Sequence, residues 1–178
     1  MAEVPTLTDG VVVLDRLSPD DAAAHLAGED DEHARRFGWF PKRSTEATVK
    51  AAIARWEADW RDDGDTRAFA TRAVDTGALV GGCQLRFRGE GVMQISYWTF
   101  PSARGRGYAR RAVVLACTFA FEDLGIARVE AIAEPDNLAS RRVLERAGFV
   151  EEGVLRDRGS FADGRRDMVL YSFLPRDR

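Results

Sequence analysis

Residues 93–111 (MQISYWTFPSARGRGYARR) constrain the fold of this chain more than any other stretch. They begin as a β-prone strand, and after Tyr108 small and apolar residues recur at the three- and four-residue spacing of a helix. Between the two, Pro101 ends the strand, and Gly105 and Gly107 loosen the backbone. Strand, glycine-rich turn and helix start together direct several backbone N–H groups, and the positive end of a helix dipole, to one point. Such a point binds anions, above all the pyrophosphate of a nucleotide.

Two common phosphate-binding loops do not fit this turn. The dinucleotide-binding fingerprint needs a third glycine where this chain has Arg110, and the Gly-Lys-Ser/Thr sequence of the P-loop occurs nowhere. What remains is the pattern Arg104-x-x-Gly107-x-Ala109. An ordinary strand, turn and helix with two flexible glycines explains that pattern equally well, so the rest of the chain has to decide.

The composition indicates a single globular domain, residues 1–178, with a substantial core, because 45% of the 178 residues are hydrophobic. A net charge of −3 does not favour a nucleic-acid or membrane partner. The arginines are nevertheless concentrated in residues 104–111 and 141–146. Such local basic patches suit a small anionic ligand better than a polynucleotide.

The cysteine and histidine residues give no sign of a metal site. Cys83 and Cys117 lie in apolar segments without a C-x-x-C motif, so we expect reduced core thiols and a cytoplasmic protein. His25 and His33 are isolated in the sequence, and we expect them on the surface rather than among metal ligands. The N-terminal residues lack the pattern of a signal peptide, and no apolar run approaches the ~18 residues of a membrane span.

The order of predicted elements indicates a mixed sheet. The expected strands are residues 10–17, 67–74, 78–88, 91–99, 127–133, 154–161 and 166–174, and the expected helices are 20–27, 45–61, 105–124 and 140–147. The strands within residues 67–99 are joined by tight turns and form an antiparallel meander. The strand at 127–133 returns through a helix and therefore runs parallel to the strand at 91–99. A cleft can open between these two strands.

Residues 36–41 (RFGWFP) place three aromatic side chains outside any periodic element. A hydrophobic plug over the core explains them, and a loop that lines a substrate site is the alternative. Trp39 and Phe40 are therefore weak candidates for substrate binding.

Two segments in the second half carry a resemblance to a known family. ISYWTFPSARGRGYA (residues 95–109) and EPDNLASRRVLERAGFVEEGVLR (residues 134–156) occur in the order and separation seen in the GNAT superfamily of N-acetyltransferases, and Arg104-x-x-Gly107-x-Ala109 resembles its motif A. The likeness is to the RimJ/RimL-like branch, which acetylates N-terminal amines of ribosomal proteins, and it covers residues 74–174. It implies an α/β (α+β) fold with a mixed, mostly antiparallel sheet, splayed at the central parallel strand pair and flanked by helices.

The same resemblance implies a site for acetyl-CoA, or another acyl-CoA, as co-substrate. Backbone groups near Thr99 and Phe100 would pair with the pantetheine amides, and a backbone N–H near Phe100 would face the developing oxyanion. The pyrophosphate would lie against the helix start, at Arg104, Gly105, Arg106, Gly107, Tyr108 and Ala109. Asn137 would bind pantetheine or cap the following helix. Ser140 would protonate the departing thiolate or serve that cap.

Two positions depart from the family pattern. Gln94 stands where many members have Glu, and Leu144 stands where many have a Tyr that acts as general acid. The general base is therefore elsewhere or is water, and Glu134 is the nearest carboxylate, a weak candidate. A site without an obvious base suits an α-amine better than lysine, because the α-amine has a pKa near 8 and lysine one near 10.4.

The sequence thus predicts an N-acyltransferase that moves an acetyl group from acetyl-CoA to a primary amine, by direct attack in a ternary complex. A protein or peptide N-terminal α-amine is the expected acceptor. A small-molecule amine, such as an antibiotic or a polyamine, is one alternative, and a protein that binds acyl-CoA without turnover is the other. We expect no metal, no nucleic acid and no membrane partner, and the sequence leaves a homodimer open.

Overall fold

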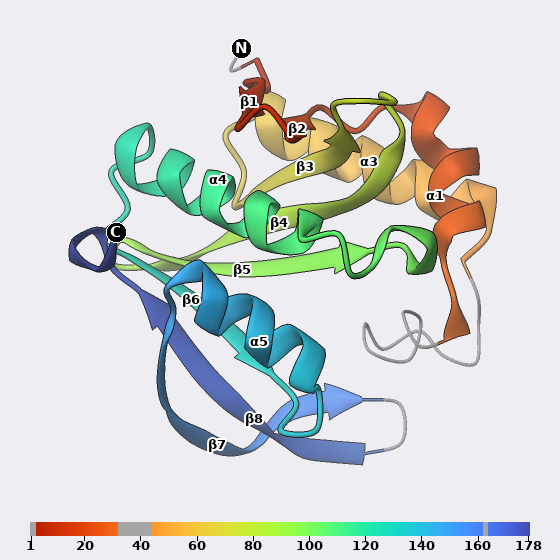
Figure 1. Cartoon of the computed structure of the whole chain (residues 1–178). Helices are drawn as coiled ribbons and strands as arrows, with labels where there is room; N and C mark the ends of the chain where they lie inside the picture. Colours follow the sequence, from red (N-terminus) through yellow and green to blue (C-terminus); the bar gives the residue numbers. More distant parts are fainter. Residues whose placement is uncertain (1–2, 32–43, 162–163) are drawn as a thin grey trace.

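The computed structural model describes residues 3–31, 44–161 and 164–178. Trp39, Phe40 and His33, for which the sequence made predictions, lie outside the described residues. The described part forms one mixed sheet in the order β1-β2-β3-β4-β5-β6-β8-β7 (Figure 1). Its strands are β1 (Leu7–Thr8), β2 (Val12–Asp15), β3 (Thr66–Ala73), β4 (Leu79–Gly89), β5 (Val92–Thr99), β6 (Arg128–Ala133), β7 (Val150–Phe161) and β8 (Gly164–Phe173). Neighbouring strands are antiparallel except for β5 and β6, which are parallel as predicted.

Helices cover both faces of this sheet. They are α1 (Ala22–Gly28), α3 (Glu46–Arg61), α4 (Tyr108–Glu122) and α5 (Leu138–Ala147), with short 3-10 turns at Pro19–Asp21, Pro101–Ala103 and Pro175–Asp177. In Figure 1, α4 and α5 lie in front of the sheet, and α3 lies behind it. In the described residues, no helix has the length and apolar character needed to cross a membrane.

The core on the α4 side follows the alternation of the strands. Leu85 and Ile95 point from β4 and β5 to the buried face of α4, where Val113 and Cys117 are fully buried. A smaller cluster on the other face packs Ile53 of α3 with neighbours from β3 and α1. The α4-side cluster also takes in Trp60 from the end of α3, next to Phe119 of α4.

The helix that follows the glycine-rich turn begins later than the sequence predicts. The prediction placed its start at Gly105, whereas α4 begins at Tyr108. Gly105 and Gly107 have φ angles of 77° and 79°, in the left-handed region that a helix cannot use. Gly107 is the N-cap residue of α4, so the glycines belong to the turn.

His25 is buried, and the prediction of a surface position for it is wrong. Its ring lies edge-on to Trp98 and Phe100 at centroid distances of 5.8 Å each, and its Nε2 is 3.3 Å from a carboxylate oxygen of Glu29. The helix lies close against the sheet at Gly28, where an added Cβ would meet the Phe100 ring, and this approach encloses the imidazole. Burial lowers the pKa of His25 below its ordinary value, against the opposing effect of the Glu29 carboxylate.

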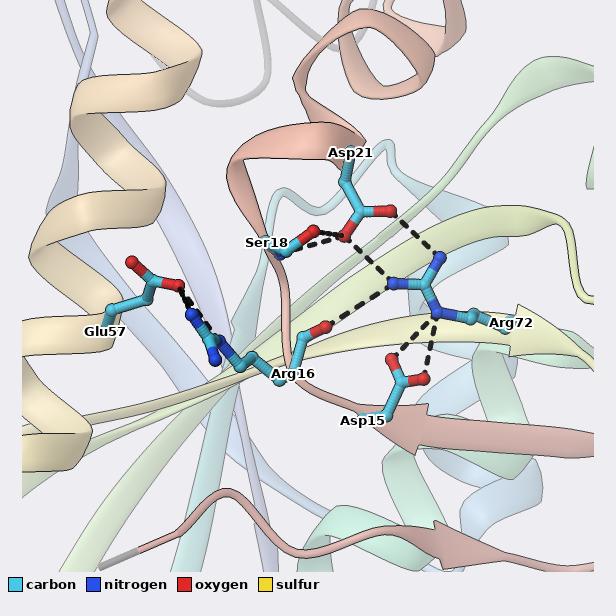
Figure 2. A network of polar contacts seen from close by, with 6 residues as sticks. All are labelled: Asp15, Arg16, Ser18, Asp21, Glu57 and Arg72. Atoms are coloured by element: carbon cyan, nitrogen blue, oxygen red, sulfur yellow. Dashed lines mark hydrogen bonds and ion pairs between the residues drawn. The ribbon is translucent and has the colours of Figure 1, made fainter. Parts of the chain in front are cut away.

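An arginine on β3 ties the start of α1 to the sheet (Figure 2). Arg72 Nε donates to both carboxylate oxygens of Asp15, and its terminal nitrogens donate to those of Asp21, all at 2.9 Å. Asp21 also accepts the backbone N–H of Ser18 at 2.8 Å, which closes a capping box at this helix start. Burial alone would raise the pKa of Asp21, but the bonds from Arg72 and Ser18 outweigh it and lower that pKa.

Candidate active site

The parallel strands β5 and β6 separate after a short paired stretch. They pair only through Val92 with Arg128, Met93 with Val129, and Gln94 with Glu130. Beyond Gln94, β5 continues along β4 and β6 continues along β8. Each strand keeps its other neighbour, so the two diverge and leave their facing edges open. The opening predicted from the order of elements is therefore present.

A cavity of about 680 Å³ occupies this opening. Its walls come from strands β4 to β8, from the turn before α4 and the first turn of α4, and from one side of α5. Cavities of this size accommodate cofactor-sized molecules.

Most of the predicted site residues line this cavity. They are Thr99, Arg104, Gly105, Gly107, Tyr108, Ala109, Glu134, Asn137 and Ser140. Phe100 and Arg106 do not line it. The Phe100 ring is buried against Gly28, where an added Cβ would lie 2.4 Å from the ring. The side chain of Arg106 is exposed to solvent.

The turn before α4 presents backbone N–H groups. The first helical hydrogen bond of α4 runs from the Arg111 N–H to the Gly107 carbonyl at 3.2 Å. No acceptor within the described residues meets the N–H groups of Tyr108, Ala109 and Arg110. These groups lie at the positive end of the helix dipole and at the cavity wall, where they can bind an anion.

Arginine side chains add positive charge to this end of the cavity. Arg104, Arg110, Arg142 and Arg146 line it. Arg104 Nε donates to the Thr99 carbonyl at 3.3 Å, and Arg110 Nε donates to the Arg146 carbonyl at 2.8 Å. Arg142 and Arg146, one turn apart on α5, make no ion pair with the described carboxylates. The sequence indicated a basic cluster at 141–146, but only the structure directs these two members to the cavity.

Tyr97 and Ser140 form a pair of hydroxyl groups in the cavity. The phenol oxygen of Tyr97 lies 2.8 Å from Ser140 Oγ and also donates to the Ser140 carbonyl at 3.1 Å. Burial raises the pKa of Tyr97 well above its ordinary value, and the bond to Ser140 offsets this only in part. The phenol is therefore protonated at neutral pH. Sequence reasoning missed Tyr97, although strand alternation places it on the same face as Ile95.

The side chain of Asn137 caps α5. Its Oδ1 accepts the Ser140 N–H at 3.2 Å, which is one of the two roles that the sequence left open. Its side-chain NH₂ group can still donate to a ligand in the cavity. The Ser140 hydroxyl takes no part in this cap, so the cap and the hydroxyl pair are separate features.

Glu134 is the only carboxylate among the described residues that line the cavity. Its side chain is 5% exposed, and Oε2 accepts a bond from Arg166 at 2.5 Å. Gln94 accepts a bond from Arg88, and Leu144 is fully buried in the core. Neither can act as a base or an acid.

The backbone of β5 directs alternate residues into the opening. The Phe100 N–H donates to the Val80 carbonyl at 2.9 Å and therefore points to β4. The Phe100 N–H itself therefore does not face an oxyanion in the opening. Because an antiparallel ladder alternates, the main-chain groups of Thr99 and Tyr97 point the other way, toward β6.

Comparisons with known proteins agree with this architecture. Residues 12–150 match the sequence model of the family described as Acetyltransferase (GNAT) domain. YdaF of Bacillus subtilis, provisionally named a ribosomal N-acetyltransferase, is 32% identical over 168 residues, 90% of each chain. YoaA of the same organism, an uncharacterized N-acetyltransferase, is 29% identical over 155 residues, 85% of this chain and 86% of YoaA.

Solved structures show the same fold. Mycobacterium smegmatis RimJ in complex with CoA-disulfide has a TM-score of 0.86 at 26% identity, covering 98% of this chain and 88% of RimJ. The ribosomal-protein-S5-alanine acetyltransferase from Vibrio fischeri has a TM-score of 0.80 at 20% identity, covering 96% of each chain.

Proposed function

Because the chain belongs to the GNAT family of N-acetyltransferases and is RimJ/RimL-like, we propose that it transfers an acetyl group from acetyl-CoA to the N-terminal α-amine of a protein or peptide. The observation that carries this proposal is the opening between β5 and β6. It is bordered by the N–H groups of the α4 start on one side and by the Tyr97–Ser140 hydroxyl pair on the other.

The described residues fit acetyl-CoA as co-substrate. The N–H groups at the start of α4, with Arg142 and Arg146, supply donors and positive charge for its phosphates. The main chain of Tyr97 and Thr99 would pair with the pantetheine amides as an added strand does. The NH₂ group of Asn137 would donate to a pantetheine carbonyl.

The reaction requires one bond to form and one to break. The amine nitrogen attacks the thioester carbonyl carbon, and the C–S bond breaks. The proton lost by the amine passes to water, and the coenzyme leaves as a thiolate that takes up a proton in turn. One hydroxyl of the Tyr97–Ser140 pair would donate a hydrogen bond to the departing sulfur while the other donates to its oxygen, because each hydroxyl carries one proton. Alignment of amine and thioester in the opening would supply much of the remaining acceleration.

The class of acceptor amine follows from the lack of a suitable general base among the residues that line the cavity. Glu134 is held by Arg166, and Gln94 cannot accept a proton. The attacking amine must therefore arrive largely neutral. At pH 7.5 about a third of α-amines are neutral, against about one lysine side chain in a thousand.

A matched pair of peptides tests the proposal. One carries a free N-terminus and an acetylated lysine, and the other carries an acetylated N-terminus and a free lysine. With acetyl-CoA and purified protein, we expect thiol release and a mass increase of one acetyl group only with the first peptide. A preference for the lysine peptide, or binding of acetyl-CoA without turnover of either peptide, would contradict the proposal.

A further inference from the structure

The cavity is lined by β5 residues from both faces of the sheet, so it has a second side whose lining differs from the side next to α5. Tyr97 points to the face covered by α5, where it meets Ser140. Its strand neighbours Ser96 and Trp98 point to the opposite face, where the Trp98 ring stacks on Trp56 of α3 at 6.0 Å. Arg86 pairs with Gln94 across β4 and β5, so both side chains lie on the Trp98 face. All of these residues except Trp56 line the cavity.

Two arginines dominate this second side. Arg86 and Arg88 both line the cavity, and Arg88 Nε donates to the side-chain oxygen of Gln94 at 3.0 Å. Neither arginine forms an ion pair with a carboxylate in the described part of the chain. By contrast, the nearby Arg128 holds both Glu130 and Glu152. Glu130, whose charge acts on Arg88, is therefore already paired with Arg128.

The electrostatic surroundings of Arg88 are positive. Burial lowers the pKa of Arg88, and the charges of Arg86 and Arg158 lower it further, outweighing the opposite effect of Glu130. Positive charge concentrated at a cavity wall attracts anionic groups and repels cations. A polyamine or an aminoglycoside, both polycations, would be disfavoured on this side of the cavity.

The spacing along β5 relates this charge to the expected site of reaction. Gln94 precedes Tyr97 by three residues in an extended strand, a separation of about 10 Å. An extended peptide rises by the same amount per residue. If its N-terminal amine lies near the Tyr97–Ser140 pair, its third and fourth residues reach Arg86 and Arg88. We infer that the preferred acceptor is a peptide α-amine followed by acidic side chains at the third and fourth positions.

This inference rests on the proposed function, and three hexapeptides test it. They share the sequence Ser-Ala-x-x-Ala-Ala, with x as glutamate, glutamine or arginine. At low ionic strength we expect kcat/KM for the glutamate peptide to exceed that for the glutamine peptide by about tenfold, the scale of two exposed ion pairs. The arginine peptide should be the poorest, and added salt should reduce the differences.

Variants locate the source of the preference. In R86Q/R88Q the ratio of kcat/KM between the glutamate and glutamine peptides should fall to about one, because the charges are gone. The control R55Q/R176Q removes two positive charges from exposed residues that do not line the cavity, and it should keep the ratio of the parent protein. The ratio is insensitive to a general loss of active protein.

The outcomes separate this inference from the proposed function. Acetylation of all three peptides at equal rates, or a glutamate preference that persists in R86Q/R88Q, would overturn the inference and leave N-terminal acetylation intact. Failure to acetylate any of the peptides, with acetyl-CoA bound, would instead overturn the proposed function on which the inference rests.

Discussion

The contact between Tyr97 and Ser140 concentrates two hydroxyl groups at the position where a thiolate would leave. We expect Tyr97→Phe to lower kcat by about tenfold to a hundredfold, the cost of a lost hydrogen bond to a charged group. The KM for acetyl-CoA should change little, because the aromatic ring and the main chain of β5 remain. Steady-state kinetics with the free-N-terminus peptide measure both constants.

Ser140→Ala provides the matched comparison, since it removes the other hydroxyl and keeps the N–H group that Asn137 caps. If the two hydroxyls act as one unit, the double variant should lose no more than the larger single loss. Independent, multiplying losses in the double variant would contradict a shared role.

At this scale the sequence predicted only part of the site. Asn137 and Ser140 were found because they share a recognisable motif in one short segment. Tyr97 and Arg86 were missed, because alternation along a strand gives the face of a side chain but not its partner from a distant helix or strand. His25 was misplaced because isolation in the sequence says nothing about which packed side chains enclose it.

The start of α4 depends on a residue that can adopt a positive φ. Gly107 has φ 79° and lines the cavity, whereas Gly77 has φ 68° in a turn that does not line it. An added Cβ meets no atom within 4 Å at either position, so only backbone strain distinguishes glycine from alanine. We expect Gly107→Ala and Gly77→Ala each to lower the free energy of unfolding by about 1 kcal/mol.

Only Gly107→Ala should also weaken co-substrate binding. A displaced helix start should raise the KM for acetyl-CoA by about fivefold, the scale of a helix-dipole interaction. Urea unfolding and acetyl-CoA saturation curves give the two quantities. Equal effects of both variants on KM would show that the change reports general destabilisation instead of the position of the α4 N–H groups.

Element order and the parallel return of β6 were predictable, because both follow from periodicity, turn residues and the length of the connecting helix. The residues at which helices and strands begin and end were harder to predict. The start of α4 was placed at Gly105, since spacing alone does not reveal that Gly105 and Gly107 are left-handed.

For the molecule as a whole, His25 links stability to pH. The unfolded chain takes up a proton on His25 near its ordinary pKa of 6.5, whereas burial lowers the pKa in the folded chain. The stabilising contribution is therefore fully present above this value and is lost as the pH falls below it. His25→Gln removes this titration and keeps a polar side chain beside Glu29.

We expect the free energy of unfolding of the parent protein to decline more steeply than that of His25→Gln between pH 6.5 and about pH 5, above the range in which most carboxylates titrate. Urea unfolding at several pH values measures both slopes. Parallel slopes for the two proteins would contradict a protonation role for this imidazole.

The divergence of β5 from β6 also divides the sheet mechanically. Strands β1 to β5 and strands β6 to β8 meet through three residue pairs, with the N–H groups of Ala127 and Arg128 bonded to the Gly91 carbonyl at the same end. A molecule that bridges the two open edges supplies main-chain bonds that the polypeptide does not make for itself. The free energy that holds the two parts together is thus linked to the binding of the reactant. Each release of the reactant therefore weakens the contact between the two parts of the sheet.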